Sequence, residues 1–501
     1  PQYGCQGLPQ TLACAVQEMW DGANMAFGLC PMLSQTAAEA IFLKGSEEQK
    51  AQYLPAMVSG RWTGTMNLTE PQAGSDLAAV RTRAVPCDEG HYLLSGQKIY
   101  ITYGEHDLSE NIIHLVLART PDAPEGVKGI SLFIVPKYIL NAKGEPGERN
   151  DVQCVSLEHK LGIHGSPTAV LSYGDQGGAV GYLVGEEDRG LEYMFIMMNR
   201  ARHAVGIESY AIAERAYQRA LNFARDRVQG RAVGEVSTER KAIARHPDVQ
   251  RMLLSMRSRI EAMRALSLFA AAAADRASHH PDADERALGQ RRVEVLTPVV
   301  KGWSSEVGNE ITGLGLQVHG GMGFIEETGA AQHYRDARIT TIYEGTTGIQ
   351  AADLVGRKLL RDGGGMVNEI IDLMRADLSA VADSPGEASQ EVGIAALSLV
   401  ELSNATATIL ESATRDPRSP FHKSFDYLML FGVTAGGWQM ARAARAAQEM
   451  LDAGDGNSDF CQAKILSCLY YARQVLPQGR AHAEAIQAQD LPAEALDQWV
   501  A

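Results

Sequence analysis

The chain has 501 residues, 45% of them hydrophobic, so it can bury a large core and form about two to four domains. Its formal net charge of -15 opposes non-specific attraction to nucleic acid or to an anionic membrane surface. The seven cysteines show no CxxC or zinc-type spacing, which favours buried thiols without a disulfide framework in a reducing compartment, so we expect a cytoplasmic protein.

The first part of the chain has the apolar spacing of amphipathic helices. In TLACAVQEMWDGANMAFGL apolar side chains recur every three or four residues, and GSEEQKAQYLPAM is rich in helix-forming Glu, Gln and Lys. We therefore expect a helical N-terminal domain over residues 1–61. The most apolar run of the chain, ALSLFAAAAA, is too short to cross a bilayer, so we expect no transmembrane segment.

The middle and the end of the chain differ in the spacing of their hydrophobic residues. Over residues 62–185, short β-rich pieces such as HYLLSGQKIYIT and NIIHLVLART alternate with Gly, Pro and Asp turns, which predicts an antiparallel β domain. Residues 186–365 return to long amphipathic patterns, which predict an antiparallel helical bundle. The Gly run in RDGGGM then precedes further helical patterns, so we expect a helical extension over 366–501 and an α+β fold overall.

Common catalytic signatures are missing from the sequence. GxGxxG, GxxxxGK[ST], GxSxG and HExxH do not occur, which removes the ordinary nucleotide, nucleophile and zinc motifs. His279 and His280 lie in the polar segment ASHHPDADE, which is typical of a solvated loop, so we propose no metal site.

Four other segments combine features of a ligand site. MNLTEPQAGSDL contains Gly74, which permits close approach of the backbone to a ligand, and GQKIYITYG ends a strand with Tyr100 and Thr102 on one face. GLQVHGGMGF holds a cluster of glycines, and RDARITTIYEGTTGIQ places Glu344 before a helix start. Each segment alone also fits an ordinary turn, strand or solvated helix terminus.

In this order, the four segments resemble the acyl-CoA dehydrogenase family, and the resemblance covers residues 1–365. It implies a helical N-terminal domain, a central antiparallel β domain and a C-terminal four-helix bundle. The helices over 366–501, with HKLGIHGSPTAVLSYG, resemble the long-form bacterial branch that includes 3-methylmercaptopropionyl-CoA and some fatty acyl-CoA dehydrogenases. Family subunits carry further helices ahead of this start, so the resemblance implies a truncated N-terminal domain.

The resemblance assigns a role to Glu344, which matches the family's catalytic base. The base removes the α-proton of an acyl-CoA while the β-hydrogen leaves as hydride to N5 of FAD, giving a trans-2-enoyl-CoA. The thioester oxygen must be hydrogen-bonded as enolate charge develops, and in the family a flavin ribityl hydroxyl and the backbone N–H of the base do this. The electrons pass to an electron-transfer flavoprotein. Thr346 or Thr347 would cap the helix that follows.

Other positions match the family one by one. A homodimer, or a dimer of dimers, with FAD at the subunit interface is implied. The matching cofactor positions are Met66, Leu68, Thr69, Ser75, Tyr100, Thr102, Arg227, Gln317, Gly320, Gly321 and Thr346. The matching substrate positions are Ser75, Asn199, Arg202 and Gly345.

The sequence also departs from the family pattern. Tyr100 stands where Trp is usual, the loop after Arg227 is one residue short, and Gly348 stands where many relatives have Gln. Arg202 fits a helix-surface arginine equally well, and Arg227 also fits an arginine of the helical bundle.

Two other functions stay open. An acyl-CoA oxidase would use the same base and flavin but pass electrons to oxygen, and these motifs do not separate the two. A non-catalytic or nucleic-acid-binding relative on the same fold is opposed by the acidic charge and the intact YEGT. The motifs leave open the acyl chain length, a methylthio-acyl preference, and a dimer versus a tetramer.

Overall fold

The computed structural model describes residues 2–88, 90–234, 239–383, 388–491 and 498–499. The chain forms two compact units, one of residues Pro1–Leu8 and Ala23–Ala204, the other of residues Pro9–Gly22 and Val205–Ala501. Two long helices, α1 (Gln10–Lys44) and α3 (Gly190–Asp226), contribute to both units. Helix α1 has a kink at Asn24, next to the point where it passes from one unit to the other.

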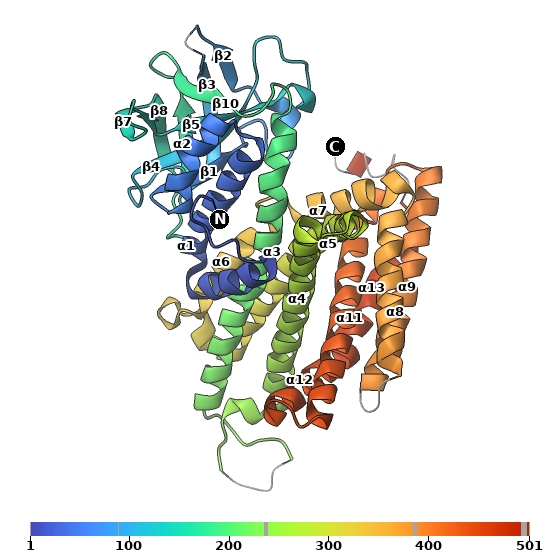
Figure 1. Ribbon diagram of the computed structural model, residues 1–501. Coiled ribbons are helices and arrows are strands. Elements are labelled where there is room, and N and C mark those ends of the chain that lie inside the picture. The colour runs from blue at the N-terminus through green and yellow to red at the C-terminus, as the bar shows by residue number, and fades with distance from the viewer. Residues whose placement is uncertain (1, 89, 235–238, 384–387, 492–497, 500–501) are drawn as a thin grey trace. The chain divides into compact units, whose positions relative to one another are not determined.

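The first unit combines the end of α1 and helix α2 (Glu47–Val58) with a β domain (Figure 1). Ser46 caps α2 in a capping box with Gln49, which explains why the Glu- and Gln-rich segment begins its helix there. The eight-stranded sheet contains β1 (Trp62–Asn67), β2 (Arg83–Pro86), β3 (Tyr92–Thr102), β4 (Asn111–Ala118), β5 (Ser131–Pro136), β8 (Val152–Leu157), β9 (Thr168–Tyr173) and β10 (Ala179–Leu183). A separate hairpin contains β6 (Tyr138–Leu140) and β7 (Pro146–Arg149).

The sheet order is β1-β4-β5-β10-β3-β9-β8, with β2 paired to β3. The predicted β domain is confirmed, but the pair β1–β4 is parallel, whereas we expected antiparallel pairing throughout. The chain passes through β2 and β3 before it returns to β4, and so long a connection permits a parallel return. Every residue of β1, β4 and β5 is buried, although β1 ends the sheet order, so this end of the sheet is covered on all sides.

The second unit is helical (Figure 1). It contains the rest of α3, then α4 (Pro247–His279), α5 (Ala283–His319), α6 (Ala330–Ala337) and α7 (Thr347–Asp353). The 366–501 region supplies most of α8 (Gly365–Ala382) and all of α9 (Ala388–Arg415), α10 (Ser419–His422), α11 (Ser424–Asp452), α12 (Ser458–Tyr470) and α13 (Gly479–Gln487). The predicted helices are confirmed, and Gly363 and Gly364 adopt positive φ angles just before α8, where the Gly run predicted a break.

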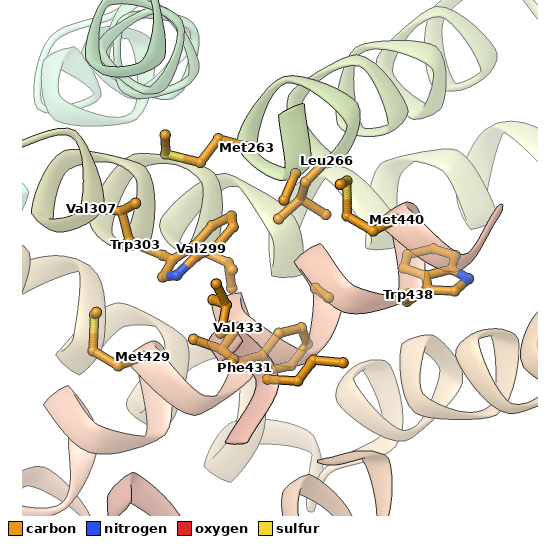
Figure 2. Close-up of a cluster of buried hydrophobic side chains, with 14 of the residues drawn as sticks. Met263, Leu266, Val299, Trp303, Val307, Met429, Phe431, Val433, Trp438 and Met440 are labelled. Carbon is orange, nitrogen blue, oxygen red and sulfur yellow. The ribbon is translucent and has the colours of Figure 1, made fainter. Parts of the chain in front are cut away.

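The C-terminal helices share one hydrophobic core with the bundle. Figure 2 shows Trp303 of α5 facing Phe431 and Val433 of α11, with Met263 and Leu266 of α4 nearby. Gly432 and Gly436 allow α11 to pass directly over the Trp303 ring, because a Cβ atom at either position would overlap that ring. The 366–501 region therefore packs directly against α5 and shares its core. It does not form a separate domain.

The structure also bears on two expectations, the absence of a transmembrane segment and the state of the cysteines. Helix α1 and the stretch Glu391–Arg415 are long and apolar enough to cross a membrane, but 56% and 44% of their most apolar windows are buried inside the protein. Core helices pass the same test, so this is weak evidence for a membrane span. All seven cysteines are free thiols, as predicted, but only Cys14, Cys30, Cys461 and Cys468 are buried. The expectation of burial is wrong for Cys5, Cys87 and Cys154, because the exposed N-terminal end and the β domain leave them partly or fully open to solvent.

Candidate active site

The segment around Glu344 has an unusual backbone. Glu344 adopts a φ of 55°, and Gly345 follows with a φ of 87°. Residues with a side chain rarely occupy this left-handed region, which costs about 1–3 kcal/mol and often marks a functional site. Helix α7 starts directly afterwards, with Thr346 as its N-cap, because the Thr346 side chain accepts a hydrogen bond from Ile349 N. Of the two predicted caps, Thr346 is thus the one observed.

Two buried side chains hold this backbone. Lys301, on α5 and fully buried, donates from Nζ to the carbonyl oxygen of Gly345 at 2.7 Å. Gln350, also fully buried, donates from Nε2 to the carbonyl oxygens of Glu344 at 3.2 Å and Gly345 at 3.3 Å. A Cβ atom at Gly345 would lie 2.8 Å from Gln350 Nε2, so glycine is required there. The conformation of Glu344 is therefore fixed from one side by three hydrogen bonds.

A third contact holds the residue before Glu344. The Tyr343 hydroxyl donates to Glu208 Oε2 on α3, and Glu208 is fully buried. Burial and the neighbouring Glu208 carboxyl raise the pKa of Tyr343 well above its usual value, so the hydroxyl stays protonated and available to donate. On the other side, Thr347 donates to Glu306 Oε1 of α5 at 2.6 Å. The segment 343–347 is therefore tied to both α3 and α5.

The first unit contains the predicted cofactor residues of the β domain. Leu68 and Thr69 follow β1, and a buried ion pair fixes them: Lys98 Nζ donates to Leu68 O at 2.9 Å and to Glu70 Oε1 at 2.8 Å. Ile99 N donates to Thr69 O at 2.9 Å. The segments MNLTEPQAGSDL and GQKIYITYG, separate in the sequence, are thus joined through Lys98.

Tyr100 lies at an irregularity of β3. The pairing of β3 with β9 shifts register between Lys98 and Ile101, and Tyr100 has a φ of 60° and is 61% exposed. Thr102 is half-buried while Ile101 between them is buried, so Tyr100 and Thr102 lie on the less buried side. Ser75 is exposed, and Met66 is buried in β1.

The remaining predicted residues belong to helices. Arg202 on α3 is only 4% exposed, so it is not a helix-surface arginine. Asn199, on the same helix, is exposed. Arg227 follows the end of α3 and is exposed, and Gln317, Gly320 and Gly321 are exposed around the end of α5. A Cβ atom at Gly320 or Gly321 would meet nothing within 4 Å, which leaves that backbone open to another molecule.

Lys301, Gln350, Tyr343 and Glu208 were not expected from the sequence. For two of these residues the sequence does contain a feature that could have identified them. Lys301 interrupts the apolar run LTPVVKGWSS, and Gln350 lies six residues after Glu344 in the same motif. No group of three or more His, Cys, Asp or Glu side chains suited to a metal occurs in the described part of the chain.

Comparisons with known proteins cover nearly the whole chain. Family models match the acyl-CoA dehydrogenase N-terminal domain over residues 1–61, the middle domain over 65–175, the C-terminal domain over 188–360, and an acetyl-CoA dehydrogenase C-terminal-like region over 367–497. The chain is 52% identical to 3-methylmercaptopropionyl-CoA dehydrogenase of Ruegeria pomeroyi, over 95% of this chain and 80% of that protein. It is 36% identical to the broad-specificity linear acyl-CoA dehydrogenase FadE5 of Mycobacterium tuberculosis, over 99% of this chain and 83% of that protein.

A solved acyl-CoA dehydrogenase of Bacillus anthracis, complexed with FAD, shares the fold. Its TM-score is 0.78 at 22% identity, over 98% of this chain and 80% of that one. The fold expected from the sequence is thereby confirmed. Together with the family models and the identity to named dehydrogenases, these comparisons show that the chain belongs to the acyl-CoA dehydrogenase family and is an oxidoreductase acting on acyl-CoA.

Proposed function

We propose that the protein removes the α- and β-hydrogens of an acyl-CoA thioester, with Glu344 as the base for the α-proton and FAD as the cofactor. The observation that carries this proposal is the fixed, left-handed Glu344, held by hydrogen bonds from the buried Lys301 and Gln350. The α-proton of a thioester is weakly acidic, so its base must be positioned before the reaction. Here a strained backbone and two buried polar side chains keep Glu344 in one position.

The exposed groups of each unit fit FAD chemically. Tyr100 presents an exposed aromatic ring. Thr102 follows it two residues later on β3, and the backbone of Thr69 is hydrogen-bonded to Ile99 beside it, so two hydroxyl side chains accompany the ring, which suits the flat face and polar edge of a flavin. Gly320 and Gly321 leave backbone open to close approach, and Arg227 is an exposed cation suited to a phosphate. When bound, FAD supplies the acceptor for the hydride from the β-carbon.

The chain's own residues do the remaining work. Glu344 accepts the α-proton, and its backbone N–H is proposed to hydrogen-bond the thioester oxygen as negative charge develops there. Gln350 holds the Glu344–Gly345 peptide through the Glu344 carbonyl, and Lys301 and Gln350 together hold the next peptide through the Gly345 carbonyl. The buried Arg202 is proposed to contribute to the substrate channel.

The substitution Glu344→Gln tests the proposal. It keeps the size and hydrogen-bonding reach of the side chain but cannot accept a proton, so flavin content and acyl-CoA binding should survive while flavin reduction slows by roughly 10²–10⁴-fold. Anaerobic mixing with saturating acyl-CoA, followed by flavin absorbance, measures this rate. Flavin that bleaches at close to the wild-type rate would mean that the base is another residue.

The identity to 3-methylmercaptopropionyl-CoA dehydrogenase supports a short methylthio-acyl substrate. A spectral titration with a panel of acyl-CoA esters, including the 3-methylthio-propionyl thioester, would rank the substrates. The relatives named as dehydrogenases favour an electron-transfer flavoprotein as the electron acceptor. Peroxide formed at the turnover rate would support the oxidase alternative instead.

We propose in addition a cytoplasmic homodimer that holds FAD at its subunit interface. Exposed apolar side chains beside Gly320 support a partner surface, with Phe324 being 89% exposed and Met322 48% exposed. Native mass spectrometry distinguishes this dimer from a monomer with full flavin occupancy. Arg227→Ala should release FAD from the dimer, and unchanged flavin content would place the phosphate contact elsewhere.

A further inference from the structure

Four buried polar side chains form a hydrogen-bonded network inside the β domain and have no role in the function proposed above. The network consists of Thr65 and Asn67 of β1, His114 of β4 and Tyr173 of β9, and none of them is more than 1% exposed. All four belong to the same compact unit. Buried polar groups are costly unless each finds a partner, so a network of them beside the predicted cofactor residues of β1 needs a physical reason.

The hydrogen bonds of the network run in one direction. The Tyr173 hydroxyl donates to Asn67 Oδ1 at 2.9 Å, and Asn67 Nδ2 donates to Thr65 Oγ1 at 2.8 Å. Thr65 Oγ1 lies 2.7 Å from His114 Nδ1. Because Thr65 accepts from Asn67, its own proton is left for His114, and Nδ1 of that ring is the acceptor. A His114 ring that accepts at Nδ1 is neutral and carries its proton on Nε2.

The protonation states agree with this direction. Burial, and then the nearby positive charge of Lys137, lower the pKa of His114 to about 3, so the ring stays neutral at physiological pH. Burial raises the pKa of Tyr173 well above its usual value, so its hydroxyl keeps the proton that it donates. The rings of His114 and Tyr173 also meet edge to face, with their centroids 6.3 Å apart. The first and the last member of the network are therefore in contact.

The network holds the end of β1 from one side. Successive side chains of a strand point to opposite faces, so Thr65 and Asn67 share the face of the network. Met66 between them, which matches a cofactor position of the family, faces the other way. Asn67 is the last residue of β1 and is bonded twice, by Tyr173 and by Thr65. The network thus sets the orientation of the strand end from which the predicted cofactor residues follow.

Strands β3 and β9 supply further anchors for this strand end. In the pairing of β3 with β9, Tyr173 and Lys98 are diagonal neighbours, so their side chains share a face. Tyr173 bonds the side chain of Asn67, and Lys98 bonds the carbonyl oxygen of Leu68 at 2.9 Å. The residue after Lys98 donates through its backbone N–H to Thr69 O at 2.9 Å. Three successive residues at the end of β1 are therefore tied to β3 and β9.

Strand β3 also carries the other predicted flavin contacts of this unit. Tyr100 and Thr102 follow Lys98 on β3, at and beyond the register shift that ends at Ile101. The position of Thr69 relative to Tyr100 therefore depends on how the end of β1 is held against β3 and β9. A flat ring can use both segments only if supporting side chains fix one relative to the other.

We propose that the network positions the β-domain part of the flavin site, by holding the end of β1 at a fixed distance from Tyr100 and Thr102. Its four side chains act through the backbone of β1 and not by touching the cofactor, so they are positioning residues and not catalytic ones. This inference rests on the proposed placement of FAD against Thr69, Tyr100 and Thr102.

Tyr173→Phe tests the proposal by deleting a single oxygen atom. Asn67 Oδ1 then lies buried without its donor, and a loss of this kind is worth about tenfold or more in an equilibrium constant. We expect the dissociation constant of FAD to rise by about tenfold, with a changed visible absorbance spectrum of the bound flavin. Titration of the apoprotein with FAD measures both. Unchanged affinity and an unchanged spectrum would overturn the proposal.

Tyr427→Phe is the matched control. Tyr427 of α11 is equally buried, and its hydroxyl lies 2.8 Å from Thr406 Oγ1 in the helical unit. Its loss should lower the Tm but leave the FAD affinity and the flavin spectrum as in wild type. An equal loss of FAD affinity in Tyr427→Phe would show that the affinity follows general stability, and it would overturn the proposal.

A second break in the network gives an independent test. Thr65→Val keeps the shape of the side chain but removes the hydroxyl that links Asn67 to His114. Thr65→Ser keeps that hydroxyl. The FAD affinity should fall in Thr65→Val and remain near wild type in Thr65→Ser, whereas equal affinities in the two variants would contradict the proposal.

A double variant separates positioning from stability. Asn67→Leu/Tyr173→Phe replaces both partners of one hydrogen bond with apolar side chains, so neither is left unpaired and the Tm should recover towards wild type. The directional link between β1 and β9 is still missing, so the FAD affinity should stay reduced. Recovery of the FAD affinity together with the Tm would reduce the network to a stabilising role and overturn the proposal.

Failure of this inference can be told apart from failure of the proposed flavin placement. If Tyr100→Ala weakens FAD binding while Tyr173→Phe does not, the flavin lies against β3 but the network does not position it. If neither variant changes FAD binding, the placement of the flavin is itself wrong, and the inference falls with it.

Discussion

Two fully buried lysines, one in each unit, hold the two loops on which the proposed function depends. Lys98 secures the loop after β1 by an ion pair with Glu70 at 2.8 Å and a hydrogen bond to Leu68 O. Lys301 secures the segment 343–347, which carries the proposed base, by a hydrogen bond to Gly345 O, and the buried Glu208 lies close to the same segment.

The two surroundings differ in how completely charge is balanced. Glu70 also accepts hydrogen bonds from the Thr82 hydroxyl at 2.6 Å and from Arg81 N at 2.8 Å. Burial raises the pKa of Glu70, but Lys98 and these donors outweigh burial and hold it below its usual value. Around Lys301, Asp21 and Glu208 keep raised pKa values. At the first site the buried acid is matched by its lysine and further donors, whereas at the second burial dominates over the nearby lysine.

Removing Lys98 should have the largest effect on stability. Lys98→Met keeps the length of the side chain but leaves Glu70 buried without its counter-charge, which typically costs about 3–5 kcal/mol of unfolding free energy. Chemical denaturation of the variant measures that cost. The double variant Lys98→Met/Glu70→Gln should recover part of it, and no recovery would mean that the lysine stem, and not the ion pair, stabilises the loop.

Removing Lys301 should affect the reaction more than the fold. Lys301→Met removes the shorter of the two hydrogen bonds to the Gly345 carbonyl and loosens the turn that carries Glu344, and a displacement of about 1 Å can cost roughly 10²-fold in rate. Anaerobic flavin reduction measures the rate, and flavin content serves as the control for folding. A variant with a normal rate would show that Gln350 alone fixes the base.

A smaller change at Gly345 sharpens the same point. Gly345→Ala places a Cβ atom 2.8 Å from Gln350 Nε2 at a φ of 87°, so we expect a loss of about 1–3 kcal/mol in stability and a slower reduction. Gly348→Ala is the control, since a Cβ atom there would meet only Thr346 Oγ1, at 3.8 Å. Equal effects in the two variants would remove the special role of the left-handed turn.

The sequence predicted the fold and the position of Glu344, but not what holds Glu344. Periodicity located the helices and the β domain, because apolar spacing follows directly from burial. The parallel pair β1–β4 and the hydrogen bond from Lys98 to Leu68 O form between segments far apart in the sequence. Local residue patterns do not predict such contacts. Asp21 and Glu208 lie in ordinary amphipathic helices, so their burial was visible only once α1, α3 and α5 were packed together.

The smallest expected effect concerns Thr346, which matches a cofactor position in the family and also caps α7. The cap bond to Ile349 N is long, at 3.3 Å, and losing a cap typically costs about 1 kcal/mol. Thr346→Ala should therefore lower the stability slightly, while Thr346→Ser, which keeps the hydroxyl, should restore it. Flavin affinity, measured by titrating the apoprotein with FAD, separates the two roles. If Thr346→Ala binds FAD as tightly as wild type, the residue acts only as the cap that starts the helix after Glu344. If FAD binding weakens at least tenfold and recovers in Thr346→Ser, the hydroxyl also contacts the cofactor.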